Sequence, residues 1–160
     1  MIHSMTVPRQ EKAYEKHAWI IPFAIGAFNF IFGLALTVGG PSIDPELELI
    51  AGVTFDQLSS SSPRVATSID FSYRNLGFAV LYGNFLIMAI SLKSYRRGAE
   101  WSWFALWVLP VFAGASILLL LSYGASSFSV LLTAIVFVVS VLGLLLPYRK
   151  FFPKKQAVTS

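Results

Sequence analysis

The run WSWFALWVLPVFAGASILLLLSYGASSFSVLLTAIVFVVSVLGLLLP, residues 101 to 147, contains no Asp, Glu, Lys, Arg or His. The motif GASS at 124–127 divides it into two apolar stretches, 101–123 and 128–147. A helix needs about 20 apolar residues to cross about 30 Å of hydrocarbon, so each stretch is long enough for one crossing. Lipid offers the backbone no hydrogen-bond partner, so each crossing must be helical. The run therefore predicts two membrane helices joined by a short turn.

Two further segments without ionisable residues, 19–38 and 75–92, complete a set of four expected spans. The whole chain of 160 residues is 56% hydrophobic and only 12% charged. An ordinary soluble domain carries about 25% charged residues, so this composition indicates a membrane protein. We find no internal repeat and no second domain, and we expect a single all-α membrane domain over residues 1–160.

The positions of Lys and Arg indicate the orientation, because cytosolic loops are enriched in these residues. Ten of the twelve basic residues fall on one side of four alternating spans, and the other side holds only Arg64 and Arg74 beside five acidic residues. We therefore expect a multi-pass protein of the cell membrane with both termini cytosolic. The short links 96–100 and 124–127 make neighbouring spans antiparallel, which predicts a four-helix up-down bundle.

The connection between the first two spans, residues 39–62, is the only sizeable segment expected outside the membrane. Asp44 is placed to cap a short helix whose first residue is Pro45. Thr54 and Gln57 have the spacing of a capping box, which predicts a second helix start. We expect one or two short extra helices in this outer connection.

The second span belongs to a longer expected helix. Ser62 followed by Pro63 predicts a helix start, and no residue after Pro63 stops a helix before Gly98. We therefore expect one helix from about residue 63 to about residue 95, whose first turns project beyond the membrane. Gly98 and Gly124 are suited to the C-termini of the helices that precede them.

A candidate site lies along one face of this long helix. At about 100° per residue, Asp70, Arg74 and Asn84 fall within an arc of about 80°. Asp70 and Arg74 are four residues apart, the spacing of an ion pair on a helix. Asn84 lies deeper on the same face, and we expect it to hydrogen-bond Asn29 of the first span; a ligand contact is the alternative. An arginine in this position is also able to hold a lipid phosphate or a carboxylate through its two-pronged guanidinium.

Aromatic residues mark the start of the third span. Trp101 and Trp103 are expected at the cytosolic boundary, where indoles anchor helices at the level of the lipid headgroups. Pro110 is expected to kink this span. We predict no metal site and no cofactor, because the chain has no cysteine and its two histidines share no ligand spacing with acidic residues. The basic residues cluster beside apolar runs, so nucleic acid is not an expected partner.

Three stretches resemble a pattern in small, uncharacterised prokaryotic membrane proteins: TFDQLSSSSPRV (54–65), YRNLGFAVLYG (73–83) and SYRRGAEWSWFALWVLP (94–110). In that pattern an Arg-x-x-Gly opens the second helix, and an R-R-G-x-x-W-x-W turn joins helices two and three. The matching residues here are Arg74, Gly77, Arg96, Arg97, Gly98, Trp101 and Trp103. The architecture is similar to DoxX-like four-helix proteins. The resemblance covers about residues 54–110 and implies the fold but no activity.

Three functions are compatible with these features. The first is a small membrane protein that acts by association, as an accessory or structural subunit, with another membrane protein or a second copy as partner besides lipid; seams of small residues such as Gly26 and Gly33 favour it. The alternative is a lipid or small-molecule binding protein, or a membrane enzyme, with an outward-opening polar pocket near Arg74 and Asn84. No catalytic set is apparent. A transporter or channel is third, since ion-coupled transporters place ionisable groups inside the membrane and these spans have none.

Overall fold

Four helices in the computed structural model, which describes residues 12–153, are long and apolar enough to cross a membrane. All the regular structure in that range is helical. The main parts of the four helices are α2 (Ile20–Gly39), α5 (Pro63–Ile90), α7 (Val108–Ser122) and α8 (Ser127–Leu145). The shorter elements are α1 (Ala13–His17), the 3-10 turn η1 (Gly40–Ile43), α3 (Pro45–Ala51), α4 (Phe55–Ser61), the π-helical turn η2 (Ser91–Tyr95), α6 (Glu100–Leu106) and α9 (Tyr148–Phe151). The chain is an all-helical protein with the architecture of a multi-pass membrane protein.

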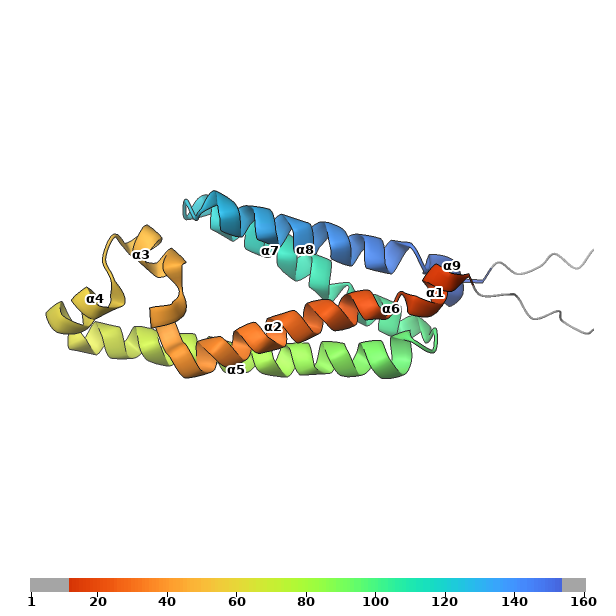
Figure 1. Cartoon of the computed structure of the whole chain (residues 1–160), viewed down its shortest axis with the longest axis horizontal. Coiled ribbons are helices and arrows are strands. Elements are labelled where there is room, and N and C mark those ends of the chain that lie inside the picture. Colours follow the sequence, from red (N-terminus) through yellow and green to blue (C-terminus); the bar gives the residue numbers. More distant parts are fainter. Residues whose placement is uncertain (1–11, 154–160) are drawn as a thin grey trace, which may run out of the picture.

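The long helices form two pairs (Figure 1). α2 lies along α5, and α7 lies along α8. The two pairs meet at one end of the molecule, the terminal end, where α1, α6 and α9 gather. They separate toward the other end, the connection end, which carries η1, α3 and α4.

Prolines set where three of the helices break. Proline has no N–H, so the carbonyl four residues before it loses its helical partner. α2 begins two residues before Pro22, and α8 ends two residues before Pro147. The third expected span, 101–123, is interrupted at Trp107 into α6 and α7, three residues before Pro110. The kink expected from Pro110 is therefore a local break in that helix.

The connection end contains the helix starts predicted from its sequence. Asp44 caps α3 by accepting a hydrogen bond of 3.0 Å from the N–H of Glu46. Thr54 and Gln57 cap α4 reciprocally, each side chain accepting from the other residue's backbone N–H at 3.2 and 3.1 Å. Ser62 precedes α5 as predicted but forms no side-chain cap. α5 and η2 together cover residues 63–95, the range in which one long helix is expected.

Two glycines allow α2 and α5 to approach closely. A Cβ atom on Gly77 would lie 2.5 Å from Oγ1 and 2.7 Å from the backbone N of Thr37. A Cβ atom on Gly33 would lie 3.0 Å from the backbone N of Leu81. Because real Cβ atoms essentially never come within 3.0 Å of backbone atoms, the pairing requires glycine at position 77, and at position 33 a Cβ atom would be tighter against α5 than most real Cβ contacts. Small residues at helix crossings are the usual means of close association in membranes.

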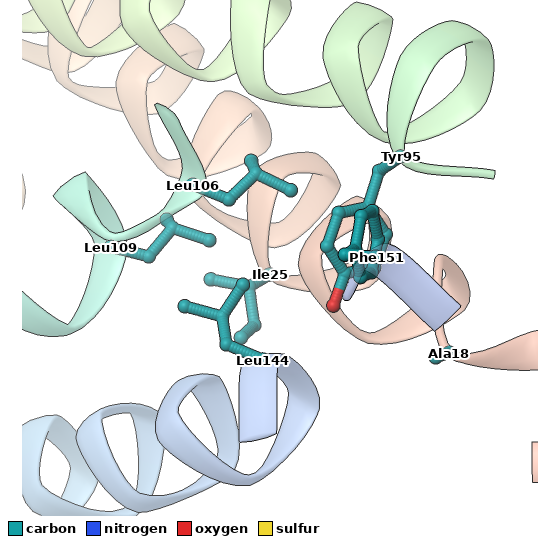
Figure 2. Packing of buried hydrophobic residues seen from close by; sticks show 7 residues of the cluster. All are labelled: Ala18, Ile25, Tyr95, Leu106, Leu109, Leu144 and Phe151. Atoms are coloured by element: carbon teal, nitrogen blue, oxygen red, sulfur yellow. The ribbon is translucent and has the colours of Figure 1, made fainter. Parts of the chain in front are cut away.

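The core lies at the terminal end (Figure 2). Its most deeply buried large side chains are Tyr95, Leu106, Leu144 and Phe151, each no more than 2% exposed. Tyr95 and Phe151 stack with ring centroids 4.6 Å apart. These side chains come from η2, α6, α8 and α9, so the core joins the two helix pairs.

Two donors, one buried and one half-buried, complete the C-terminus of α8. Pro147 leaves the carbonyl of Gly143 without its helical partner, and the hydroxyl of Tyr95 donates to that carbonyl at 2.7 Å. α8 ends at Leu145, and the indole N–H of Trp103 donates to the carbonyl of Leu144 at 2.9 Å. An unpaired buried carbonyl is costly, so both donors stabilise the junction of the two pairs.

Candidate functional site

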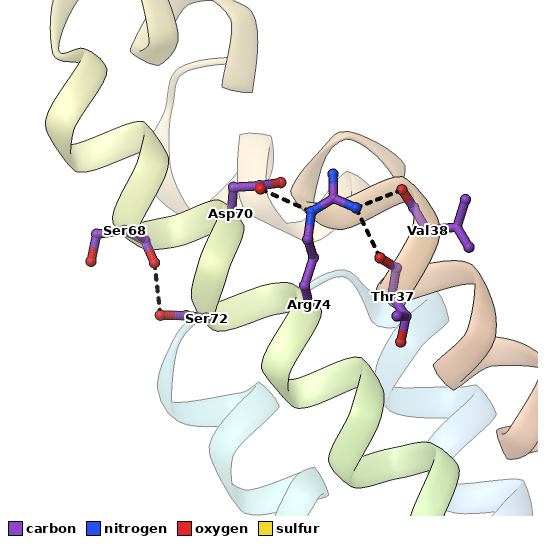
Figure 3. A network of polar contacts seen from close by, with 6 residues as sticks. All are labelled: Thr37, Val38, Ser68, Asp70, Ser72 and Arg74. Atoms are coloured by element: carbon purple, nitrogen blue, oxygen red, sulfur yellow. Dashed lines mark hydrogen bonds and ion pairs between the residues drawn. The ribbon is translucent and has the colours of Figure 1, made fainter.

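Arg74 connects α5 to the end of α2 (Figure 3). Its Nε donates to Oδ2 of Asp70 at 2.9 Å, which is the predicted ion pair within α5. Its Nη1 donates to the carbonyls of Thr37 and Val38, both at 2.9 Å. The last carbonyls of a helix have no partner inside the helix and carry partial negative charge. The guanidinium of Arg74 therefore caps the C-terminus of α2.

Gly40 makes room for this cap. Its φ of 60° lies in the left-handed region, which favours glycine. A Cβ atom on Gly40 would lie 2.5 Å from Oδ1 of Asp70 and 3.4 Å from Nη2 of Arg74. The chain therefore turns away from α2 directly beneath the ion pair.

These contacts determine what Arg74 is able to bind. The side chains of Arg74 and Asp70 are 43% and 34% exposed, so the pair is at the surface. An anion approaching the guanidinium would meet the carboxylate of Asp70 and the negative end of α2 at the same place. The geometry favours an ion pair that caps a helix over a phosphate or carboxylate site.

The predicted hydrogen bond between Asn84 and Asn29 is not formed within residues 12–153. Asn84 donates Nδ2 to the carbonyl of Val80, one turn earlier in α5, at 2.8 Å. An amide that bonds its own helix satisfies a donor without needing a partner on α2. Both asparagines are half-buried. The deeper polar residue of this face, Asn84, therefore bonds within its own helix and not across to α2.

The two tryptophans predicted as anchors occupy different surroundings. Trp101 is 56% exposed at the terminal end, as suits an interfacial side chain. Trp103 instead packs against other aromatic rings and donates to the carbonyl of Leu144. Its ring neighbours are Phe104, Trp107, Tyr148 and Phe152, with centroids 5.1 to 5.7 Å away. Trp103 thus belongs to the core that joins the two helix pairs.

A carboxylate that was not predicted as a site residue joins the connection to the second helix pair. Glu46 of α3 accepts hydrogen bonds from the backbone N–H of Ser126 at 3.0 Å and from the hydroxyls of Ser126 and Ser129. Ser126 caps α8, so the carboxylate lies at the positive end of that helix. Glu46 lies outside the four long helices. The hydroxyls of Ser126 and Ser129 and the N–H of Ser126 lower the pKa of Glu46 below its usual 4.5.

Sequence reasoning missed Glu46 because its partners lie 80 residues and more away in the chain. The one available signal was Ser126 at the start of an apolar run, where a free helix N-terminus attracts a carboxylate. Asp44 also has a distant partner that sequence reasoning missed. Its carboxylate accepts a hydrogen bond of 3.0 Å from the hydroxyl of Tyr73.

The other acidic residues of the connection border a shallow pocket. The pocket has a volume of about 340 Å³, and its lining includes Asp44, Glu48 and Asp56 but neither Arg74 nor Asn84. Within residues 12–153, no group of three or more His, Cys, Asp and Glu side chains is arranged to hold a metal ion.

Comparisons with protein families, with curated proteins and with solved structures found no match for this chain. The resemblance to DoxX-like proteins stays a prediction. The function is therefore inferred from the residues of this chain.

Proposed function

We propose that the protein acts by association: a small multi-pass membrane protein whose α5 binds a transmembrane helix of a second membrane protein. In this proposal the four spans run up and down as a bundle in the cell membrane. The terminal end, with most of the Lys and Arg residues, lies in the cytosol, and the connection end lies outside.

The observation that carries this proposal is the exposed face of α5. The face that packs on α2 contains Ala66 and Gly77, which are buried. Ser72, Asn75 and Gly83 lie away from that face, about 100° to 180° around the helix. The small and polar members of this outer face are all exposed: Ser68, Ser72, Asn75, Ala79 and Gly83. Tyr82 and Leu86 share the face and are 71% and 59% exposed. Ser68 and Ser72 precede the expected span 75–92. Within that span, small and polar residues such as Asn75, Ala79 and Gly83 are typical of a helix–helix interface rather than of a lipid-facing surface.

Two glycines in α5 show the difference between the faces. Gly77 is needed inside this chain, because a Cβ atom there would collide with α2. At Gly83 a Cβ atom would meet nothing within 4 Å among the described residues. The fold of this chain therefore gives no reason for glycine at position 83. A partner helix approaching α5 as closely as α2 does on the other side would supply one.

Asn75 supports the same face. Its side chain is exposed at the start of the predicted span 75–92 and forms no hydrogen bond with the described residues. Exposing an amide to hydrocarbon without a partner is costly. An amide or hydroxyl on a neighbouring helix would satisfy it, with a gain of about 0.6 to 2 kcal/mol.

A ligand site at Arg74 receives less support. The guanidinium already donates to two carbonyls and one carboxylate, and the pocket of the connection is lined by carboxylates rather than by Arg74. Association is therefore the function that the geometry favours.

Matched substitutions in α5 test the proposal. Gly83→Leu should leave the unfolding midpoint in mild detergent unchanged but abolish the complex seen by native mass measurement after gentle extraction. Gly77→Leu should lower the unfolding midpoint, because it overpacks the contact with α2, typically at a cost of about 1 to 3 kcal/mol. Extraction of the wild-type chain as a lone monomer would refute association, and so would a Gly83→Leu variant that keeps the complex.

The absence of cysteine from the chain allows a sharper version. A photo-crosslinking label on a single cysteine at Ala79 should capture a protein in native membranes. The same label at Phe112 of α7, which is 69% exposed, should capture only lipid. Capture of a second copy identifies a homo-oligomer, and capture of another polypeptide identifies an accessory subunit. Equal labelling of lipid alone from both positions contradicts the proposal.

The proposed orientation has its own test. In intact cells, a membrane-impermeant maleimide should label Ser60→Cys in the connection but not Glu100→Cys at the terminal end. The reverse pattern would show that the termini lie outside, and it would leave the association test unaffected.

A further inference from the structure

We propose that the terminal end of the molecule binds the phosphate groups of anionic lipids through a collar of exposed cations. The basic collar consists of Lys12, Lys16, Lys93, Arg96, Arg97 and Arg149, all of which are exposed. This inference goes beyond association, because it concerns a different surface and a different class of partner.

Lys150 brings the three parts of the collar together. Its Nζ donates to the carbonyl of Arg96 at 2.9 Å and to the carbonyl of Glu15 at 3.4 Å. α9, the turn after η2 and α1 therefore lie against one another, although they are far apart in the sequence (Figure 1). The collar is a property of the fold and is not a single basic stretch.

The cations on η2 and on the turn after it have little acidic compensation among the described residues. Glu100 is an exposed carboxylate at this end. Lys93, Arg96 and Arg97 form no ion pair within residues 12–153. The guanidinium of Arg96 lies 5.3 Å from the ring centroid of Trp19, a cation–π contact that holds this side chain in place. Arg97, the next residue in the chain, is also exposed.

The surroundings of the collar indicate lipid rather than a soluble partner. Three aromatic side chains at the same end, Tyr14, Trp101 and Tyr148, are 46%, 56% and 47% exposed. Exposed aromatic residues at the ends of apolar helices are typical of headgroup depth in a bilayer. Cations at that depth face phosphate groups, and each contributes about 1 kcal/mol when the lipid is anionic. Arginine also binds phosphate through two parallel hydrogen bonds.

The test uses the full chain in lipid nanodiscs, so it does not depend on orientation in cells or on a protein partner. The lipid is phosphatidylcholine alone or a mixture with phosphatidylglycerol, and native mass spectrometry counts the lipids retained by the released protein. Wild type should retain phosphatidylglycerol in preference to phosphatidylcholine. Arg97→Gln should reduce this preference roughly fivefold, the factor that corresponds to the loss of one interfacial cation.

Three controls show whether the collar itself carries the lipid preference. Arg64→Gln removes an exposed cation from the connection end and should leave the preference unchanged. Arg96→Lys keeps the charge and should retain most of the preference, whereas Arg96→Gln should not. Equal unfolding midpoints in phosphatidylcholine show that the variants are folded.

Several results would overturn the inference. They are an unchanged preference in Arg97→Gln, an equal loss in Arg64→Gln, or no preference in wild type. Stabilisation by soluble inorganic phosphate in phosphatidylcholine nanodiscs, without any effect of phosphatidylglycerol, would assign the collar to a free anion instead.

Discussion

The two ends of the molecule satisfy the unpaired carbonyls of a helix C-terminus with different kinds of donor. At the terminal end, the C-terminus of α8 receives hydrogen bonds from Tyr95 and Trp103, which are neutral donors within an aromatic core. At the connection end, the C-terminus of α2 receives hydrogen bonds from Arg74, a half-exposed cation. Both arrangements satisfy carbonyls that a helix end leaves unpaired.

The difference lies in what surrounds the donors. Packing at the terminal end is insensitive to salt and pH, because its donors do not titrate in the ordinary range and its neighbours are apolar. The connection end depends on the charges of Arg74, Asp70 and Glu46, which solvent screens. We therefore expect the terminal end to hold the two helix pairs together and the connection end to adjust to conditions.

The largest expected effect comes from removing a ring at the terminal end. Tyr95→Ala leaves a cavity in the core and an unpaired carbonyl at Gly143, and we expect a loss of about 3 to 5 kcal/mol of unfolding free energy. Denaturant titration in mild detergent, followed by tryptophan fluorescence, measures this loss. Tyr123→Ala is the control, because that ring is 66% exposed, and its effect should be small. Similar losses for the two variants would show that the terminal end is not the main stabilising junction.

A smaller effect is expected from the charged cap at the other end. Arg74→Gln removes the hydrogen bonds to Thr37 and Val38 and should lower the free energy of unfolding clearly less than Tyr95→Ala does, since solvent screens this exposed guanidinium. The same titration measures it, with Arg64→Gln as the control without such contacts. The loss should shrink at high salt. A loss as large as that of Tyr95→Ala would contradict the division between the ends.

The smallest expected change is a local, pH-dependent release of α3. The pKa of Glu46 is lowered in the folded protein, so its contacts with Ser126 and Ser129 contribute stability above about pH 4.5 and lose it as the pH falls through the lower, folded pKa. Spin labels at Leu49→Cys and Phe128→Cys should report a longer and broader distance at low pH. The Glu46→Gln variant weakens the contact and should show that distance at neutral pH. A distance that is independent of both pH and this substitution would show that the contact of Glu46 with Ser126 and Ser129 does not hold α3 in place.

The sequence predicted the helices well because the signals for them are local. Four stretches without Asp, Glu, Lys, Arg or His locate the four candidate membrane helices, and short-range chemistry predicts the caps at Asp44 and Thr54. The interruption at Trp107 was foreseen only as a kink from Pro110, since the proline shows where a bond is missing but not how far the chain turns.

The candidate site was less predictable because it depends on contacts between distant segments. The Asp70–Arg74 pair follows from spacing within one helix. The bonds of Arg74 to α2, and those of Glu46 to α8, require knowledge of which helix ends face each other. Asn84 shows the reverse case, because a polar side chain on the expected face found its partner one turn away in its own helix.

The π-helical turn η2 lies where the long helix reaches the core of the terminal end. The N–H of Arg96 donates to the carbonyl of Ser91, five residues earlier, at 3.1 Å, so this turn contains one residue more than an α-helix would. The wider turn takes up this extra residue locally, where the long helix ends. Tyr95, the last residue of η2, donates to the carbonyl of Gly143, and Arg96, which follows it, lies over the ring of Trp19. The widened turn thus lies directly at the two contacts that tie this helix to α8 and to the start of α2.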